Sequence, residues 1–483
     1  MMLNFDNSFS RLPGSFYSKQ KPVAVTRPEL VHVNQSAARL LDLAEEDINV
    51  PDFASYFSGN TILKGSDPLA MVYAGHQFGY YVPQLGDGRA LLLGEVVNNK
   101  GERWDVQLKG SGITPYSRMG DGRAVLRSTI REYLCAEAMN YLGIPTTRAL
   151  CIISTNELVY RDVPEPGAIL TRLSLSHIRF GHFEYFYYTN QHDALKELAN
   201  YVLQRHYPDM PFNKEGYLHL YREAVIKTAK LIAQWQAFGF CHGVMNTDNM
   251  SIIGLTIDYG PFGFLDNFNP GHICNSSDCA GRYAYNQQPQ IAQWNLIALA
   301  QALTPLIEIE QLNEALQLFM PEFHRQYFGL LRQKIGLKKA FPTDEALIND
   351  LLKLLATNQV DYTLFFRALA TLDSTAQNNN LTDFFTSKQI INEWLIHYTE
   401  RLTKETVSKE ERRLAMNKIN PKYILRNYLA EKAIEDAYDK NDYDEIAKLH
   451  QLLQKPFDEQ PDNKQYAVTP PDWSHKISIS CSS

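Results

Sequence analysis

The sequence has little cysteine and no long hydrophobic run, and both shortages exclude classes of protein. Six cysteines in 483 residues are too few for a scaffold held together by disulfides, and they favour a reducing compartment. No stretch approaches the roughly 18 consecutive apolar residues of a membrane-spanning helix. Residues 1–6 also lack the features of a secretory or transit signal, so we expect a cytoplasmic protein with no membrane partner.

The sequence also lacks an excess of positive charge. It has 47 Lys and Arg residues against 54 Asp and Glu residues, which gives a net charge of −7. A global positive field that would attract nucleic acid or anionic lipid is therefore not expected. Hydrophobic residues make up 45% and aromatic residues 12% of the chain, a composition that excludes a disordered protein and favours a large packed core with room for a cleft.

Strand-like segments precede helical segments along the chain. Residues 90–96 and 103–109 flank a turn and predict a hairpin. A helical period begins at Arg123 and stops at Gly143, and strands are expected at residues 149–154, 158–160 and 168–173. After about residue 195 the pattern is mostly helical, and residues 456–483 form a tail without periodicity. This order predicts an α+β fold with a small β-rich lobe and a large helical lobe.

The tetrapeptide Gly-Asp-Gly-Arg occurs twice, at residues 86–89 and at residues 120–123. Glycines let the backbone approach an anion closely, and arginine adds several hydrogen-bond donors. The first copy precedes a strand and taken alone is also typical of a simple turn. The second copy is expected directly before a helix, where the first amide groups and the helix dipole favour phosphate.

A lysine and a glutamate are expected to face a polar cleft. Strand alternation places Lys109 on the side opposite Trp104, Val106 and Leu108. On the following helix, Glu132 projects from a largely apolar stripe, so its carboxylate needs a partner. A solvated glutamate beside Arg127 or Arg131 is the alternative interpretation.

The densest polar chemistry lies in residues 242–260. Asn249 and Asp258 are expected at the two ends of a short hairpin, where their oxygens suit a hard cation that accompanies nucleotide phosphates. Asp248 is a candidate base that accepts a proton from an attacking hydroxyl. A turn stabilised by Asn and Asp side chains is the alternative explanation of this segment.

In chain order, these features match the parts of the protein-kinase fold: a Gly-rich turn, a strand lysine, a helical glutamate, a His-Gly loop and an Asp-Tyr-Gly segment. Val244 stands where a kinase has its general base, so the usual base for phosphorylation is missing. We expect a two-lobed kinase-like fold with an N-terminal extension (1–65), an N-lobe (66–175), a C-lobe with the catalytic and metal loops (176–330), and a C-terminal helical region and tail (331–483).

The same segments resemble the selenoprotein O family nearly from end to end. The residues that carry the resemblance are 86–89, 107–112, 120–123, 242–249, 258–263 and 420–427. The resemblance implies an ATP-dependent enzyme that binds the nucleotide in a flipped orientation and transfers AMP to Ser, Thr or Tyr hydroxyls of proteins. Self-modification is a further expectation.

The resemblance also implies roles for individual residues. Lys109 would hold phosphates and pair with Glu132, and Arg172 and Arg179 would clamp the phosphate tail. Asp248 would be the catalytic base. Magnesium, or manganese in its place, would bind Asn249 and Asp258. The nucleotide site would further include Gly86, Gly88, Arg89, Asp121 and Gly122.

Members of this family often carry a cysteine or selenocysteine near the C-terminus, and here that residue is Cys481. We hypothesise a disulfide between Cys274 and Cys481 that gates the metal loop under oxidation. A free exposed thiol is the alternative. His272, Cys274 and Cys279 lack the fourth ligand and the paired spacing of a zinc site, so we do not expect zinc.

Two other functions remain open at this point, besides ordinary protein phosphorylation, which ranks below both forms of nucleotide transfer. Little in the motifs fixes the base of the nucleotide, so manganese-dependent transfer of UMP to proteins is one alternative. The second is an inert pseudokinase scaffold that binds nucleotide, as Val244 would suggest. The polar residues Asp248, Asn249 and Asp258 argue against the scaffold.

Overall fold

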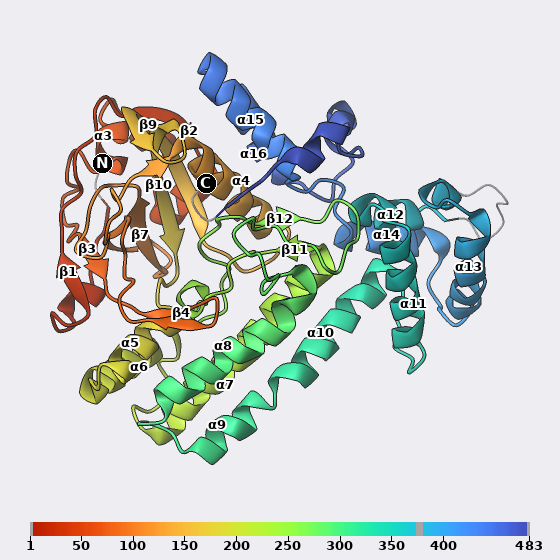
Figure 1. Ribbon diagram of the computed structural model, residues 1–483, viewed down its shortest axis with the longest axis horizontal. Coiled ribbons are helices and arrows are strands. Elements are labelled where there is room, and N and C mark those ends of the chain that lie inside the picture. Colours follow the sequence, from red (N-terminus) through yellow and green to blue (C-terminus); the bar gives the residue numbers. More distant parts are fainter. Residues whose placement is uncertain (1–2, 373–379, 481–483) are drawn as a thin grey trace.

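The computed structural model describes residues 3–372 and 380–480, and it has the mixed α+β architecture that the sequence predicts. Figure 1 shows the strands gathered in one region and the long helices α7, α8 and α10 in another. The fold prediction is confirmed at this level. The boundaries near residues 65, 175 and 330 stay a prediction.

Eight strands of the described residues form one antiparallel sheet in the order β1-β3-β6-β7-β10-β9-β2, with β8 paired to β10. Both edge strands, β1 and β2, come from the first 65 residues, so the N-terminal extension is built into the sheet. The strands are β1 (Tyr17–Lys19), β2 (Glu29–Val33), β3 (Leu69–Met71), β6 (Ala90–Val97), β7 (Arg103–Lys109), β8 (Ala124–Val125), β9 (Arg148–Tyr160) and β10 (Pro164–Ser174).

The predicted hairpin is present as β6 and β7, in a register that pairs Ala90 with Lys109. Val106 and Leu108 are buried in the core with Trp104 packed against it, and Lys109 lies on the other face, as the alternation predicts. The prediction of two short strands at 149–154 and 158–160 was wrong. They form the single strand β9, because β10 pairs with both halves across a bulge between Pro166 and Ala168.

Helix α4 (Leu126–Tyr141) packs on β9 and β10, and α15 and α16 contact it as well (Figure 1). The second Gly-Asp-Gly-Arg segment does not directly precede this helix, which corrects the expectation. Ala124 and Val125 come between them and pair with Ala168 and Gly167 of β10. The first amides of α4 are therefore not part of that turn.

The second half of the described chain is dominated by helices. The long helix α7 ends at Phe238, where Gly239 adopts the left-handed conformation (φ 72°) that ends helices at low steric cost. It packs against α8 and α10. These helices are α7 (Lys214–Phe238), α8 (Gln288–Leu303), α9 (Ile309–Leu316), α10 (Phe319–Lys334), α11 (Asp344–Thr357), α12 (Tyr362–Leu369), α13 (Lys388–Leu402), α14 (Lys409–Ile419), α15 (Asn427–Lys440) and α16 (Asp444–Leu453).

Shorter elements connect these two regions. Helices α5 and α6 follow the sheet, and two small two-stranded sheets, β4–β5 and β11–β12, lie near the loop that carries Asp248. Helices α1 to α3 belong to the N-terminal 65 residues. The bounds are α1 (Gln35–Ala38), α2 (Glu45–Ile48), α3 (Phe53–Phe57), α5 (Phe180–Tyr188), α6 (His192–His206), β4 (Gly75–Gln77), β5 (Tyr80–Val82), β11 (Phe240–Cys241) and β12 (Gly263–Phe264).

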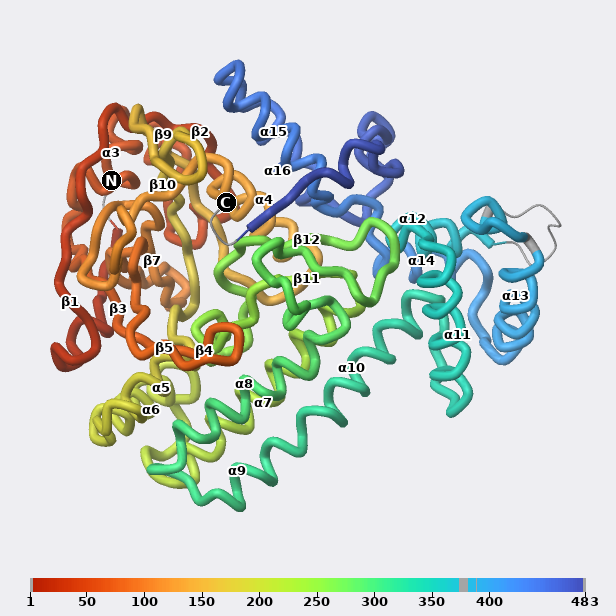
Figure 2. Tube along the Cα trace, viewed as in Figure 1, coloured from red at the N-terminus to blue at the C-terminus, as the bar shows by residue number. Residues whose placement is uncertain are grey.

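The C-terminal segment runs back toward α4 instead of leaving the molecule (Figure 2). The backbone amide of Ser276 donates to the carbonyl of Ile479 at 2.8 Å, so the described end of the tail lies beside the loop that carries Cys274. Cys481 is outside the described residues, and the disulfide with Cys274 therefore stays a prediction.

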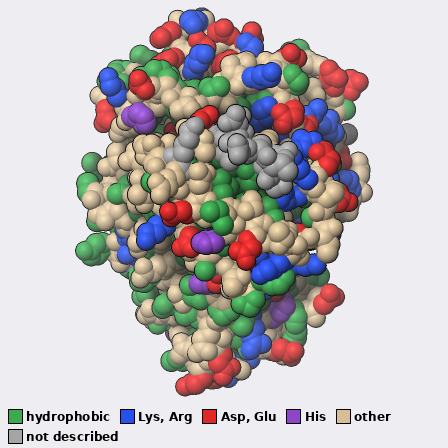
Figure 3. Space-filling model, turned by 90° about the vertical axis from the view of Figure 1, so that its right-hand side faces the viewer, with side chains coloured by type: hydrophobic (Ala, Val, Ile, Leu, Met, Phe, Trp, Pro, Cys, Tyr) green, Lys and Arg blue, Asp and Glu red, His purple; other side chains and the backbone are tan. Residues whose placement is uncertain are grey.

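Charges of both signs are interspersed on the face shown in Figure 3. That face has no broad basic patch, in keeping with the net charge of −7. Within residues 3–372 and 380–480, no helix is long and apolar enough to cross a membrane.

Arg426 joins the C-terminal helices to the rest of the molecule. It is buried at the start of α15 and contacts Asp266 at 2.6 Å and Asp361 at 2.9 Å. Replacing Arg426 with Ala leaves the buried Asp361 carboxylate without its counter-charge, and we expect a loss of about 3–5 kcal/mol in the free energy of unfolding. Urea unfolding measures this loss. Lys432→Ala, at an exposed site on α15, is the control and should change stability by less than about 0.5 kcal/mol. Equal stability of the two variants would contradict the role of Arg426.

Candidate active site

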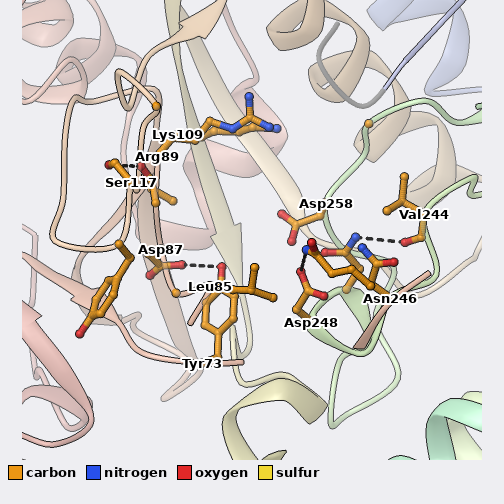
Figure 4. A pocket seen from close by; sticks show the side chains of 18 of the residues that line it. Tyr73, Leu85, Asp87, Arg89, Lys109, Ser117, Val244, Asn246, Asp248 and Asp258 are labelled. Carbon is orange, nitrogen blue, oxygen red and sulfur yellow. Dashed lines mark hydrogen bonds between the residues drawn. The ribbon is translucent and has the colours of Figure 1, made fainter. Parts of the chain in front are cut away.

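A cavity of 540 Å³ lies between the sheet and the loops that follow α7, a size typical of small-molecule sites. In Figure 4, Asp248, Asp258 and Asn246 stand on one side, and Asp87, Arg89 and Ser117 on the other. The cavity brings together the predicted nucleotide, catalytic and metal residues except Glu132, which lies directly behind it. They are Gly86, Gly88, Arg89, Lys109, Asp121, Gly122, Arg172, Arg179, Asp248, Asn249 and Asp258.

The first Gly-Asp-Gly-Arg turn is held rigidly at the cavity wall. Asp87 is buried, and its carboxylate accepts hydrogen bonds from the Met71 amide at 3.0 Å and the Tyr73 hydroxyl at 3.4 Å. Gly86 has a φ of 68°, and a Cβ on it would lie 2.5 Å from the Tyr116 ring. Only glycine fits there, so this turn can bring its backbone close to a ligand.

The second Gly-Asp-Gly-Arg turn is held by an ion pair that could not be predicted from the sequence. Arg161, near the β9–β10 turn, contacts the Asp121 carboxylate at 2.8 Å. Gly122 has a φ of 68°, and a Cβ on it would lie 2.1 Å from the carbonyl oxygen of Gly112. Asp121 therefore acts here as a structural acid at the cavity rim, and Arg161 adds a cation to the cavity.

Five side chains form a chain of alternating charge at the back of the cavity. Lys109 bonds to Glu132, and Arg172 Nε donates to the other oxygen of Glu132 at 2.6 Å. Arg172 Nη1 contacts Asp258 Oδ1 at 2.8 Å, and Arg179 bonds to Asp258 Oδ2. The predicted pairing of Lys109 with Glu132 is thus present, and the two arginines converge on Asp258.

The pKa values follow from burial and from this pairing. Burial lowers the pKa of Lys109 to about 8, although Glu132 opposes the shift. Burial alone would raise the pKa values of Glu132 and Asp258, but the arginines hold both below their ordinary values. Both carboxylates therefore stay ionised. Their negative charges are needed because the cluster contains three buried cations.

The remaining polar residues of the site lie on the loop that follows α7. His242 is buried, with its ring 5.2 Å from the Trp235 ring and Nε2 2.9 Å from the Ile257 carbonyl, so it is a structural residue. The expected hairpin between Asn249 and Asp258 is absent from the described residues. The segment instead makes single bridges from Ser251 to Arg179 and from Thr256 to Thr146. These long-range contacts replace the local pairing that the sequence suggested.

Asp248 lies at the buried end of the cavity with an incomplete set of partners. Its Oδ2 accepts a hydrogen bond from Gln77 Nε2 at 3.2 Å, and its Oδ1 has no hydrogen-bond partner among the residues that the structure describes. Burial raises the pKa of Asp248 to about 7, although Arg179 and Gln77 oppose the shift. A carboxylate with a pKa near neutrality is suited to accept a proton at physiological pH.

Asn249 and Asp258 fit one side of a magnesium site. Asn249 Nδ2 donates to the Val244 carbonyl at 3.0 Å, so its amide oxygen is the atom that could bind a cation. Among the described residues there is no group of three or more His, Cys, Asp or Glu side chains that could hold a metal alone. Magnesium usually binds one or two protein oxygens and takes substrate phosphates for the rest, so this sparse donor set suits it.

Cys274 is buried beside this loop, and its thiol donates to the Cys241 carbonyl at 3.4 Å. Burial raises the pKa of its thiol well above the ordinary value. The expectation that His272, Cys274 and Cys279 bind no zinc stays a prediction.

Sequence reasoning missed several cavity residues. Gln77 and Phe78 come from the β4–β5 hairpin, and Arg161 directly follows β9. Phe78 has a φ of 51°, and its amide donates to the Tyr283 hydroxyl at 2.8 Å. No spacing or repeat in the sequence marks these residues, because they reach the site through contacts with residues far along the chain.

A cavity with glycine turns, a row of basic side chains and two carboxylates defines an enzyme that handles a nucleotide. The family model described as "Protein adenylyltransferase SelO" matches residues 1–454. The protein nucleotidyltransferase YdiU of Pseudomonas aeruginosa (strain LESB58) is 51% identical over 481 residues, which cover 100% of this chain and 99% of that protein. YdiU of Thiobacillus denitrificans (strain ATCC 25259 / T1) is 52% identical over 485 residues with the same coverage.

The chain therefore belongs to the SelO family, and it is a protein nucleotidyltransferase. The resemblance on which the sequence analysis depended is confirmed. The roles of the individual residues stay predictions.

The raised pKa of Asp248 predicts that this residue costs stability. Unfolded aspartates ionise near pH 4, so between about pH 4 and 7 the folded protein holds a proton that the unfolded chain has released. The contribution of Asp248 to stability therefore falls as the pH rises through that window. We expect Asp248→Asn to be more stable than the wild type by roughly 2–4 kcal/mol at about pH 8, with the difference shrinking toward pH 4. Urea unfolding in metal-free buffer tests this, and a difference that does not change with pH would contradict it.

Proposed function

We propose that the protein transfers AMP from ATP to Ser, Thr or Tyr hydroxyls of proteins and releases pyrophosphate. The observation that carries the proposal is the row of three buried cations, Lys109, Arg172 and Arg179, that lines the same cavity as Asp248, with Arg179 bonded to the backbone carbonyl of Asp248 at 2.7 Å. Such a row suits the β- and γ-phosphates of a nucleotide that enters with its phosphate tail first. In that orientation the α-phosphorus would be the one presented to the acceptor hydroxyl.

The donors available to the phosphates support this orientation. Arg172 Nη2 and Arg179 Nε are buried and have no hydrogen-bond partner among the described residues. A buried donor without an acceptor is costly, and a phosphate oxygen would satisfy it. Arg89 and Arg161 add further positive charge at the cavity. The departing pyrophosphate would thus develop its charge beside fixed cations, which is the main demand of this chemistry.

The chemical step then has a definite course. The acceptor oxygen forms a bond to the α-phosphorus, and the bond from that phosphorus to the bridging oxygen breaks, so that pyrophosphate leaves. The proton of the hydroxyl goes to the Asp248 carboxylate. Val244 is buried and carries no titratable group, so it cannot act as the base. A Mg²⁺ ion held by Asn249 and Asp258 would neutralise phosphate charge when bound.

Labelling with ATP tests which phosphorus is transferred. We expect the acceptor protein, or the enzyme itself, to retain label from ATP labelled at the α-phosphate and to gain the mass of an adenylyl group. Label from the γ-phosphate should leave in pyrophosphate. We expect Asp258→Ala to lower transfer roughly a hundredfold or more, because it loses a metal ligand and leaves Arg172 and Arg179 without their shared acid.

Asp193→Ala, at an exposed position in α6, is the matched control and should transfer as the wild type does. A protein that gains only phosphoryl groups would overturn the proposal. Parallel reactions with UTP and Mn²⁺ decide between AMP and UMP: faster transfer of UMP under those conditions would replace AMP as the transferred group.

A further inference from the structure

The β4–β5 hairpin packs directly on the loop that carries Asp248. The amide of His76 donates to Thr247 Oγ1 at 2.7 Å, and the amide of Phe78 bonds to both the Tyr283 hydroxyl and Asn246 Oδ1. The hairpin is not part of the eight-stranded sheet. These hydrogen bonds therefore hold the hairpin backbone against the loop that carries Asp248, and this attachment does not depend on strand pairing with the large sheet.

The hairpin holds both sides of the Asp248 carboxylate. Gln77 Nε2 donates to Oδ2 at 3.2 Å. Oδ1 faces the backbone of Gly75 so closely that a Cβ on that glycine would lie 2.9 Å from it. Within the described parts of the chain, Gln77 provides the only side-chain hydrogen bond to this carboxylate. Gly75 thus limits rotation of the carboxylate on one side, and Gln77 fixes it on the other.

Gln77 also lines the same cavity as Asp248 and is half-buried. An amide donor leaves the second lone pair of Oδ2 available, so the oxygen can accept a hydroxyl proton while Gln77 stays in place. Proton transfer depends on the direction from which the carboxylate lone pair meets the hydroxyl. A carboxylate without this hydrogen bond would be free to turn away from the acceptor.

We propose that Gln77 is a positioning residue for the transfer reaction: it orients the carboxylate of Asp248 toward the acceptor hydroxyl. The proposal rests on the proposed function. It gives the β4–β5 hairpin a direct part in the reaction on the acceptor side of the cavity, while the glycine turns and arginines hold the nucleotide.

The test compares acceptors that need a base with one that does not. Hydroxylamine attacks phosphorus as a neutral amine, before it loses a proton, so its reaction with the α-phosphate needs no oriented base. In Gln77→Ala we expect kcat for transfer to the protein acceptor labelled by the wild type to fall roughly tenfold to a hundredfold. The KM for ATP and the rate of AMP transfer to hydroxylamine should stay as in the wild type.

Gln77→Met keeps the length of the side chain without its amide, and we expect it to behave like Gln77→Ala. Gln84→Ala, at an exposed position after β5, is the control and should leave all rates unchanged. Adding Gln77→Ala to Asp248→Asn should cause no further loss, because Gln77 acts through Asp248.

Losses that add in the double variant, an equal loss with hydroxylamine, or unchanged transfer in Gln77→Ala would each overturn the positioning role. These outcomes leave the proposed function standing. If the wild type transfers no AMP, the proposed function fails, and the role of Gln77 fails with it.

Discussion

The site depends on two carboxylates that neutralise three cations in a buried place. Glu132 binds Lys109 and Arg172, and Asp258 binds Arg172 and Arg179, so each acid is shared by two bases. Buried charges persist only when they are paired, and removal of one partner leaves the others uncompensated. The network therefore joins β7, α4, β10, the start of α5 and the loop that begins at Asp258 into one unit. A phosphate that enters the cavity meets cations that are already in position.

Contacts on the far side of Glu132 from the cavity hold α4 against the loop that begins at Asp258. Arg131, the neighbour of Glu132, is buried, and its Nη2 donates to the Phe262 carbonyl at 2.9 Å and to Asn427 Oδ1 at 3.2 Å. Its guanidinium lies 4.5 Å from the centre of the Phe262 ring. The C-terminal helices are thus tied, through Asn427 at the start of α15, to the loop that begins at Asp258.

The parts of the site that the sequence predicted are those with a local cause. Lys109 could be assigned to the polar face because a strand alternates, and Glu132 needed a partner because it stands in an apolar stripe. Arg172 and Arg179 could be named only through the family resemblance, since nothing local distinguishes them from surface arginines. The expected hairpin after Asn249 failed because residues 251 and 256 pair with Arg179 and Thr146 instead. Gln77 was missed for the same reason: its partner lies 171 positions away.

On the proposed function, the contacts of Asp258 would couple nucleotide binding to metal binding. Asp258 has a φ of 57°, and both of its oxygens accept from arginines in the described state. On the proposed function, phosphate oxygens compete with Asp258 for the same guanidinium groups, and each phosphate contact frees lone pairs of the carboxylate. The acid becomes a better metal ligand when the phosphates that the metal also needs are present. A cation would then bind weakly without nucleotide, although the arginines keep Asp258 ionised.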